Sequence, residues 1–537
     1  MNDEAGPSTL PTPPPQKRGR KLLIDPHVAA SLDAAKLTDR KATIVLASVL
    51  KKTCTEPQKF NINRSSIRRQ RIKHRKVIAE CLKKEFKPDL PLTIHWDGKL
   101  IEDITGHETV DRLPILVSGH GVDQLLAVPK LERGTGEACA SAVHETVQTW
   151  GLSDKVKCLC FDTTAVNTGL RNGCCVILEQ KMEKDMLWLA CRHHIMEIML
   201  EAIANQALGP SSGPEVLLFK RFKKNWTHIN PKDYKNVISD PESAKYVENI
   251  SSGMISFAQD QLREYQPRDD YRELLNLTII YLGGIPDSGV AFRMPAGLHR
   301  ARWMAKAMYC FKLFMFRHQF KMTKREEKAV KDICTFTAVI YVKYWFEAPA
   351  GQCAPRNDLN LLKDLITFKN INLAMANVAL KKVLGHLWYL SEELVSFAFF
   401  DDKLPIEVKK KMVMALKNEG LEYCPKRISL DAKHIMEKDI EDFVTSNSLR
   451  FFQILGISSR FFNKDVENWE GDEDFKAAKK IVQSMRVVND IAERGVALME
   501  EYNKLLTTNE DQKQYLLLVV KQFRKKYPNA QKSTLLS

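Results

Sequence analysis

Apolar and polar positions alternate in short blocks between residues 92 and 203. Apolar runs of strand length occupy five segments: 92–99, 112–119, 123–131, 156–162 and 186–190. Helical periodicity covers residues 137–150 and 172–182, before and after the fourth run. Strands of about five to eight residues, separated by turn residues or by helical crossovers, predict a mixed sheet covered by helices. The pattern therefore favours an α+β fold.

Two of the predicted strands end in an aspartate. Asp97 closes the first apolar run and Asp162 closes the fourth. An aspartate at the end of an apolar strand is costly to bury unless it is paired or holds a cation. If the two strands are neighbours, a metal site is the first hypothesis to test. Structural alternatives stay open, because Asp162 could begin an Asx turn and Asp97 could lie in an Asp-Gly hairpin turn.

The rest of the chain has a predominantly helical period. Residues 25–86 carry three helical patterns, with Thr38 and either Asn63 or Ser65 as candidate N-caps. From about residue 201 to 472 the strand signal nearly vanishes, and a final helix is expected from about 474 to 504. This order predicts a long all-α insertion into the sheet domain, which is physically easy because loop length adds little closure free energy.

Charge and cysteine content narrow the setting of the 537-residue chain. A formal net charge of +15 favours an anionic partner, and basic residues cluster at 17–21 and 64–76. The chain has twelve cysteines, and those within apolar runs are expected to be reduced core thiols: Cys158, Cys160, Cys174 and Cys175. Without a visible secretory signal or long apolar span, an intracellular protein with no membrane partner is expected. The basic clusters allow nuclear import.

The order of strands, helices and aspartates resembles the RNase H-like nuclease core. More narrowly, the chain resembles hAT-superfamily transposases in five motifs: WDG at 96–98, FDTTAVNTG at 161–169, the CxxH of Cys191 and His194, HRARW at 299–303, and AER at 492–494. Two positions depart from the family pattern. Ala492 stands where the family usually has serine, and Lys99 stands where it often has tryptophan. The family's zinc-dependent BED finger is not expected, because the N-terminal segment has only Cys54 and Cys81 as cysteine ligands.

The resemblance implies that the first and fourth strands are neighbours in the sheet, which would bring the carboxylates of Asp97 and Asp162 together. It also implies a catalytic site. Asp97, Asp162 and Glu493 would be catalytic carboxylates that bind Mg²⁺ or Mn²⁺, with His194 beside the scissile phosphate. In the insertion, Arg302 would contact phosphate and Trp303 would stack on a flipped base. Alternatives remain on the last helix, where Asp490, Glu500 and Glu501 compete with Glu493. Cys191 and His194 could equally be a buried thiol and a helix-start histidine, and Trp303 a core residue.

The apolar stripe of the last helix places Glu493 on its flank. The stripe has seven members: Val488, Ile491, Ala492, Gly495, Leu498, Met499 and Tyr502. Gly495 inside a helix costs about 1 kcal/mol relative to alanine, which suggests close backbone packing at this point. Zinc is a further possibility for Cys191 and His194, with Cys158 or Cys174 as additional ligands, although the spacings match no known zinc ribbon.

The third N-terminal helix is strongly basic. A three-helix unit of this kind fits DNA binding of helix-turn-helix type, with six candidate contacts: Arg64, Arg68, Arg69, Arg71, Lys73 and Arg75. The alternative is a solvated basic helix that packs through Ile67, Val77, Ile78 and Leu82. The segment order then predicts five parts. They are a disordered basic and Pro-rich tail at 1–24, a helical DNA-binding-like unit at 25–90, the first part of an RNase H-like core at 91–203, an all-α insertion at 204–472, and the last helix of the core with a C-terminal tail at 473–537.

Three functions are compatible with these patterns. The first is a nuclear, homo-oligomeric hAT-like DNA transposase that cleaves transposon ends with Mg²⁺ or Mn²⁺ and joins them to target DNA, a form of DNA recombination. The second is a transposase-derived nuclear factor that binds DNA or protein and has lost catalysis. The third is a helical scaffold without nucleic acid, which the basic residues at 64–76 disfavour.

Overall fold

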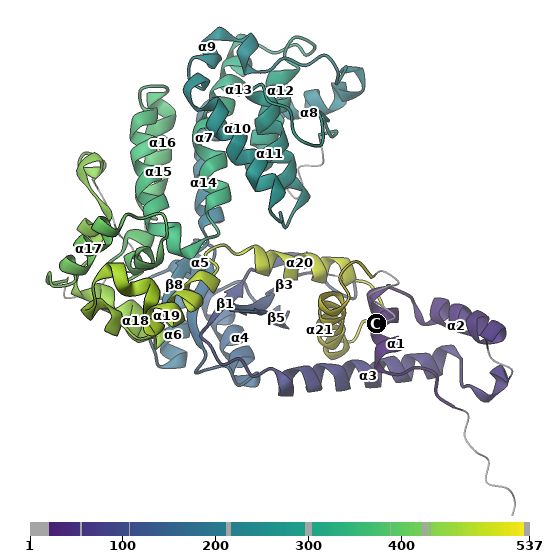
Figure 1. Ribbon diagram of the computed structural model, residues 1–537. Helices are drawn as coiled ribbons and strands as arrows, with labels where there is room; N and C mark the ends of the chain where they lie inside the picture. Colours follow the sequence, from purple (N-terminus) through teal and green to yellow (C-terminus); the bar gives the residue numbers. More distant parts are fainter. Residues whose placement is uncertain are drawn as a thin grey trace, which may run out of the picture. The chain divides into compact units, whose positions relative to one another are not determined.

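A computed structural model describes residues 21–53, 56–106, 108–210, 216–295, 303–386, 388–420, 426, 428 and 431–530 (Figure 1). The expected disorder of residues 1–20 and the expected role of Arg302 lie outside these ranges. The chain divides into two units. The first comprises the described parts of Met1–Lys87, Ile101–Val110 and Ala497–Ser537, and the second those of Pro88–Leu100 and Asp111–Val496.

A five-stranded mixed sheet is the centre of the second unit. Its strands are β1 (Leu92–Trp96), β4 (Ile115–Gly119), β5 (Val122–Ala127), β7 (Val156–Phe161) and β8 (Leu187–Ala190). They lie in the order β5-β4-β1-β7-β8. The pairs β5-β4 and β4-β1 are antiparallel, whereas β1-β7 and β7-β8 are parallel. The predicted mixed sheet is confirmed, and so is the prediction that the strands before Asp97 and Asp162 are neighbours.

A second, three-stranded sheet was not predicted. It consists of β2 (Lys99–Glu102), β3 (Thr109–Arg112) and β6 (Lys130–Leu131), in the order β2-β3-β6. These strands have two to four residues, and most positions of β2 are exposed. Such short strands with charged side chains lack the alternation of apolar and polar residues by which a strand is identified.

Two helices predicted beside the sheet are confirmed as α4 (Gly136–Thr149) and α6 (Cys174–Met182). The Thr135 side chain caps α4 by accepting a hydrogen bond of 3.3 Å from the Ala138 amide. A Cβ atom on Gly136 would come within 2.2 Å of the Asn172 carbonyl. This position therefore needs glycine, which lets α4 pack closely on the segment that follows Asp162.

Helices form most of the described chain after β8. The longer ones are α7 (Arg192–Leu208), α8 (Leu217–Asn225), α10 (Glu248–Arg263), α11 (Asp269–Tyr281), α12 (Trp303–Met315), α13 (Lys324–Phe336), α15 (Ala354–Phe368), α16 (Leu373–Val383) and α17 (Ile406–Ala415). A π-helical turn, Thr337–Tyr341, connects α13 to α14 (Val342–Glu347). Among the described residues none of the helices is both long and apolar enough to span a bilayer.

The predicted final helix at 474–504 is wrong in one respect, because it is two helices. They are α19 (Glu473–Ser484) and α20 (Asp490–Tyr502), with an extended segment between them. In that segment the Val487 carbonyl accepts a hydrogen bond of 3.0 Å from the Arg192 amide, and Arg486 forms an isolated bridge with Ala350. Tertiary bonds to other segments thus override the local helical preference.

The first unit contains the three predicted N-terminal helices, α1 (Pro26–Ala34), α2 (Asp39–Thr53) and α3 (Arg64–Glu85). Asn63 caps α3, as predicted, by accepting a hydrogen bond of 2.8 Å from the Ser66 amide. Residues 505–537 were predicted as a tail, but α21 (Glu510–Lys526) contacts α1 and α3. Ile24, which was assigned to the disordered tail, is buried in the apolar cluster of this unit.

Candidate functional site

The two strand-closing aspartates lie at one edge of the five-stranded sheet. β1 and β7 run parallel with His95 opposite Cys160. Asp97 and Asp162 each stand two residues after this pair, so both follow the carboxyl ends of neighbouring strands. In open sheets, ligands bind at the carboxyl ends of parallel strands.

Asp162 begins an Asx turn, which is the structural alternative considered from its sequence. Its Oδ1 accepts hydrogen bonds from the Thr164 amide (3.1 Å), the Thr164 hydroxyl (2.6 Å) and Asn167 Nδ2 (2.7 Å). The Oδ1 of Asn167 in turn accepts a bond of 2.9 Å from the indole NH of Trp96. Asn167 therefore fixes the carboxylate of Asp162 to the last residue of β1.

Asn489, just before α20, holds the start of that helix at the same sheet edge. Its Nδ2 donates to the Trp96 carbonyl (2.8 Å), and its backbone amide donates to Cys191 Sγ (3.2 Å). Its Oδ1 lies 3.3 Å from Nδ1 of His95, whose Nε2 lies 2.7 Å from the Ser118 hydroxyl. Burial lowers the pKa of His95 to about 3, so this ring is neutral and serves as a structural connector.

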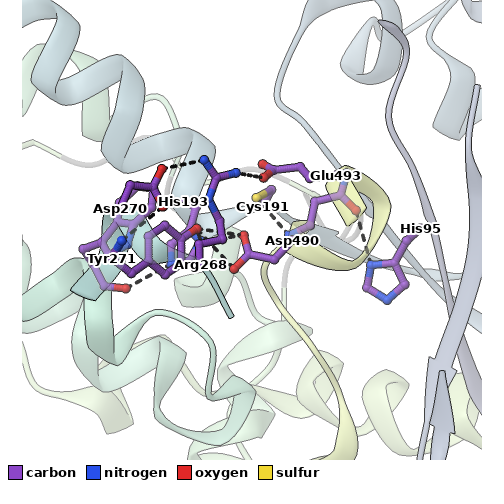
Figure 2. Close-up of polar contacts among 10 residues, drawn as sticks. His95, Cys191, His193, Arg268, Asp270, Tyr271, Asp490 and Glu493 are labelled. Atoms are coloured by element: carbon purple, nitrogen blue, oxygen red, sulfur yellow. Dashed lines mark hydrogen bonds and ion pairs between the residues drawn. The ribbon is translucent and has the colours of Figure 1, made fainter. Parts of the chain in front are cut away.

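Glu493 lies one turn further along α20 and forms an ion pair with Arg268. Nη1 of Arg268 donates to Oε2 of Glu493 at 2.9 Å (Figure 2). The other edge of the guanidinium binds both carboxylate oxygens of Asp270, at 2.9 Å and 2.5 Å. Burial opposes the charged form of Arg268, but the hydrogen bond and negative charge of Asp270 raise its pKa above the ordinary value.

A buried histidine next to the predicted one joins α7 to α20. Nδ1 of His193 lies 3.0 Å from Oδ1 of Asp490 (Figure 2). Its Nε2 donates to the Trp345 carbonyl at 3.0 Å. The imidazole stacks on the Trp345 ring with 3.9 Å between centroids. The Tyr271 hydroxyl donates to both oxygens of Asp490 at 3.2 Å. Asp490, the competitor of Glu493 in the sequence, is thus part of a structural network.

His194 and Cys191 have different settings in the structure. Cys191 is a buried thiol immediately before α7, and His194 is half-buried within the first turn of that helix. The core thiols Cys158, Cys160, Cys174 and Cys175 are buried and free, as predicted, and burial raises the pKa of each. The network beside His194 is made by His193, which sequence reasoning missed because a doubled histidine gives no sign of which ring points inward.

The carboxylates at this end of the sheet supply only some of the ligands that a divalent metal ion needs. Asp97 and Asp162 offer the hard oxygen ligands that Mg²⁺ and Mn²⁺ prefer. Glu493 comes from the helix that begins at the same edge, but its carboxylate is paired with Arg268. Within the described ranges, no three His, Cys, Asp or Glu side chains are grouped so that they could hold a metal ion. In this arrangement the predicted triad is not assembled.

Trp303 is the described part of the predicted base-stacking pair. It begins α12, where its backbone amide donates to Oε2 of Glu197 at 2.5 Å. The ammonium of Lys306 lies 3.7 Å from the centroid of the Trp303 ring, a cation–π contact. Trp303 is half-buried, so its exposure alone does not distinguish a core residue from a base-stacking residue.

In the first unit, α3 corrects two of the predicted DNA contacts. Arg71 and Arg75 are buried and bind the carboxylate of Asp33, which is itself fully buried. Arg71 also donates to Asp39 at 2.8 Å. Their guanidiniums are therefore used inside the protein. The remaining predicted contacts are exposed on α3: Arg64, Arg68, Arg69 and Lys73. Ile67 packs in the core as the alternative proposed, whereas Val77 is exposed.

Comparisons with known protein families and with curated proteins give no match to this chain. The features that bear on function are the end of the sheet that carries Asp97 and Asp162, the helix α20 that begins there, and the exposed basic residues of α3.

Proposed function

We propose that this protein acts on DNA as a metal-dependent transposase of the hAT type with an RNase H-like core. In this proposal Asp97, Asp162 and Glu493 are the carboxylates that bind Mg²⁺ or Mn²⁺. The bound cation would activate the attacking oxygen and stabilise the leaving oxygen of a phosphodiester. The protein would be nuclear and would assemble as a homo-oligomer on transposon ends.

One observation carries the proposal. The two aspartates follow adjacent parallel strands, and Asn489 fixes the beginning of α20 to the residue before Asp97. Segments at the two ends of a long chain therefore supply acidic residues to one edge of a sheet. The helices between β8 and α19 fit an insertion into this core, because they add no named strand within the described ranges.

The exposed basic residues of α3 support a nucleic-acid partner. Arg64, Arg68, Arg69 and Lys73 lie on one helix with exposed side chains, while two neighbouring arginines are used to fix that helix to α1. A rigidly held helix with several exposed cations is suited to contact the phosphate backbone of duplex DNA. This role was proposed from the sequence and now rests on four of the six original residues.

A second function is favoured by the ion pair between Arg268 and Glu493. If Glu493 stays with Arg268, the protein would be a transposase-derived nuclear factor that binds DNA or protein without cutting. The two functions share the fold and the basic helix, so binding alone does not separate them. Cleavage does.

The test is Mn²⁺-dependent nicking of supercoiled plasmid by the full-length protein. The proposal predicts nicking by the wild type and its loss in Asp97→Asn and Asp162→Asn, because the amides keep the shape but lose the charge that a hard cation needs. Asp154→Asn, a substitution in the turn before β7, is the matched control and should nick normally. Equal nicking by all four proteins, or by none of them, would leave the non-catalytic function as the better account.

A further inference from the structure

Contacts other than the one with Glu493 hold Arg268 in a fixed orientation. Asp270 binds the Nε and Nη2 edge of the guanidinium, and the guanidinium carbon lies 5.5 Å from the centroid of the Tyr271 ring (Figure 2). Tyr271 is buried and bonded to Asp490. The Nη1 edge is the part that remains for Glu493. A guanidinium held along one edge by a carboxylate and beside an aromatic ring loses little further freedom when its remaining edge binds a second carboxylate.

The backbone of α20 is fixed independently of this ion pair. Asn489 is bonded to β1, and the Glu493 amide donates to the Asn489 carbonyl at 3.3 Å. Gly495 packs against Pro114 and Leu116 of the β4 region. The helix therefore keeps its place at the sheet edge whether or not Arg268 holds Glu493. A glutamate side chain has several staggered conformers, so its carboxylate can change partner without a change of fold.

We propose that Arg268 is a positioning residue that keeps Glu493 out of the metal site and so controls divalent-cation binding. This inference rests on the proposed function, because it takes Glu493 as the third metal ligand. One carboxylate oxygen that accepts from a guanidinium loses much of its capacity to bind a cation. The positive charge beside it also repels a second cation. Glu493 therefore binds a metal ion only when Arg268 releases it.

The partial exposure of the pair makes release feasible. The side chains of Arg268 and Glu493 are 31% and 26% exposed, in contrast to the buried pair of Arg71 and Asp33. Breaking a partly exposed ion pair costs much less stability than breaking a buried one, because water solvates the separated charges. After release, Arg268 keeps its bidentate partner Asp270, so neither charge is left buried and alone.

The experiment is calorimetric titration of Mn²⁺ into full-length protein. Arg268→Gln should bind Mn²⁺ roughly three- to tenfold more tightly than the wild type, the range expected for the loss of one competing charge-assisted hydrogen bond. Arg268→Lys keeps the charge but loses the two-edged geometry, and it should fall between them. Arg263→Gln on α10 is the matched control, because Arg263 is exposed and pairs with Asp260. It should leave the affinity unchanged.

The double variant identifies the cause. Glu493→Gln should weaken Mn²⁺ binding, and Arg268→Gln combined with Glu493→Gln should be as weak, because no carboxylate is left to release. If Arg268 has a purely structural role, Arg268→Gln should bind Mn²⁺ no more tightly than the wild type, because removing a structural interaction does not tighten a metal site. Unchanged or weaker binding in Arg268→Gln overturns the inference.

The proposed function fails by a different result. If Asp97→Asn and Asp162→Asn bind Mn²⁺ like the wild type, or if none of the proteins binds it, the metal site itself is wrong. If the aspartate variants bind weakly and Arg268→Gln equals the wild type, the metal site stands and only the role of Arg268 is refuted.

Discussion

Asn489 donates a hydrogen bond of 2.8 Å from Nδ2 to the carbonyl of Trp96, although 393 positions separate the two residues. This bond joins the segment before α20, the helix that carries Glu493, to the end of β1, the strand that precedes Asp97. The neutral ring of His95 and the thiol of Cys191 complete the same junction. The proposed chemistry depends on this junction, and the proposed binding of a metal ion depends on the partner of Glu493.

A side chain at Gly495 should destabilise the protein because α20 packs closely on the β4 region. A Cβ atom here would lie 2.9 Å from Pro114 Cβ and 3.1 Å from Leu116 Cδ1. Gly495→Ala should lower the free energy of unfolding by about 1 kcal/mol, since overpacking outweighs the gain in helix propensity. Gly253→Ala is the control, because no atom lies within 4 Å of the added Cβ in α10. It should stabilise the protein, and urea denaturation measures both.

Asp33 should be essential to the first unit. Its buried carboxylate is shared by Arg71 and Arg75, so Asp33→Asn leaves the buried guanidinium of Arg75 without its counter-charge and leaves Arg71 with Asp39 alone. The expected loss is roughly 3–5 kcal/mol of unfolding free energy. Glu80→Gln breaks only an exposed pair with Lys76 and should change stability by less than about 0.5 kcal/mol. Similar small effects in the two variants would contradict the structural role given to Arg71 and Arg75.

The exposed basic residues of α3 should determine the salt dependence of DNA binding. Replacing Arg64, Arg68, Arg69 and Lys73 with alanine should make the plot of log affinity against log salt concentration less steep. The slope should decrease in magnitude by about 0.9 for each phosphate that is no longer neutralised. The measurement is fluorescence anisotropy with a labelled duplex at several salt concentrations. Alanine at Lys381 and Lys382, exposed on α16, is the control and should leave the slope as it is. An unchanged slope in the α3 variant would assign these basic residues to nuclear import or solubility.

Glu501 should make the stability of the first unit depend on acid pH. Hydrogen bonds from Arg524 and Lys36 lower the pKa of its carboxyl from 4.5 to about 2. Because the folded-state pKa is the lower one, this stabilisation is present above pH 4.5 and is lost as the pH falls toward 2. Glu501→Gln should therefore be less stable than the wild type at pH 7, by about 1 kcal/mol after solvent screening. Thermal unfolding of both proteins should converge near pH 2.

The sheet edge could be predicted from sequence because its signals are local. Apolar runs that end in Asp97 and Asp162 identify strands and their last residues, and Asn63 identifies the start of α3. The order of the strands came from a resemblance, not from periodicity. The junction at Asn489 and the pair of Arg268 with Glu493 join residues hundreds of positions apart. Periodicity shows which face of a helix is buried, but it does not show which polar group lies opposite.

The basic helix illustrates the same limit. Arg71 and Arg75 belong to the same charge cluster as the exposed arginines, and their partner Asp33 lies 38 positions before Arg71. The number of basic residues in a segment does not show which of them are exposed to solvent and which pair with a buried carboxylate. The small sheet of β2, β3 and β6 escaped prediction for a different reason, because strands of two to four residues are formed by pairing and not by their own composition.

Cleavage by Glu493 variants tests the central claim most directly. The assay compares the nicking of plasmid DNA by full-length wild type, Glu493→Gln and Glu500→Gln at saturating Mg²⁺ or Mn²⁺. Each of these proteins is also tested with Arg268→Gln as an added substitution. The account predicts that Glu493→Gln keeps fold and DNA affinity but loses cleavage in both backgrounds, while Glu500→Gln on the same helix cleaves normally. Full cleavage by Glu493→Gln would contradict the account, because the proposed metal site needs the carboxylate of Glu493 in addition to those of Asp97 and Asp162.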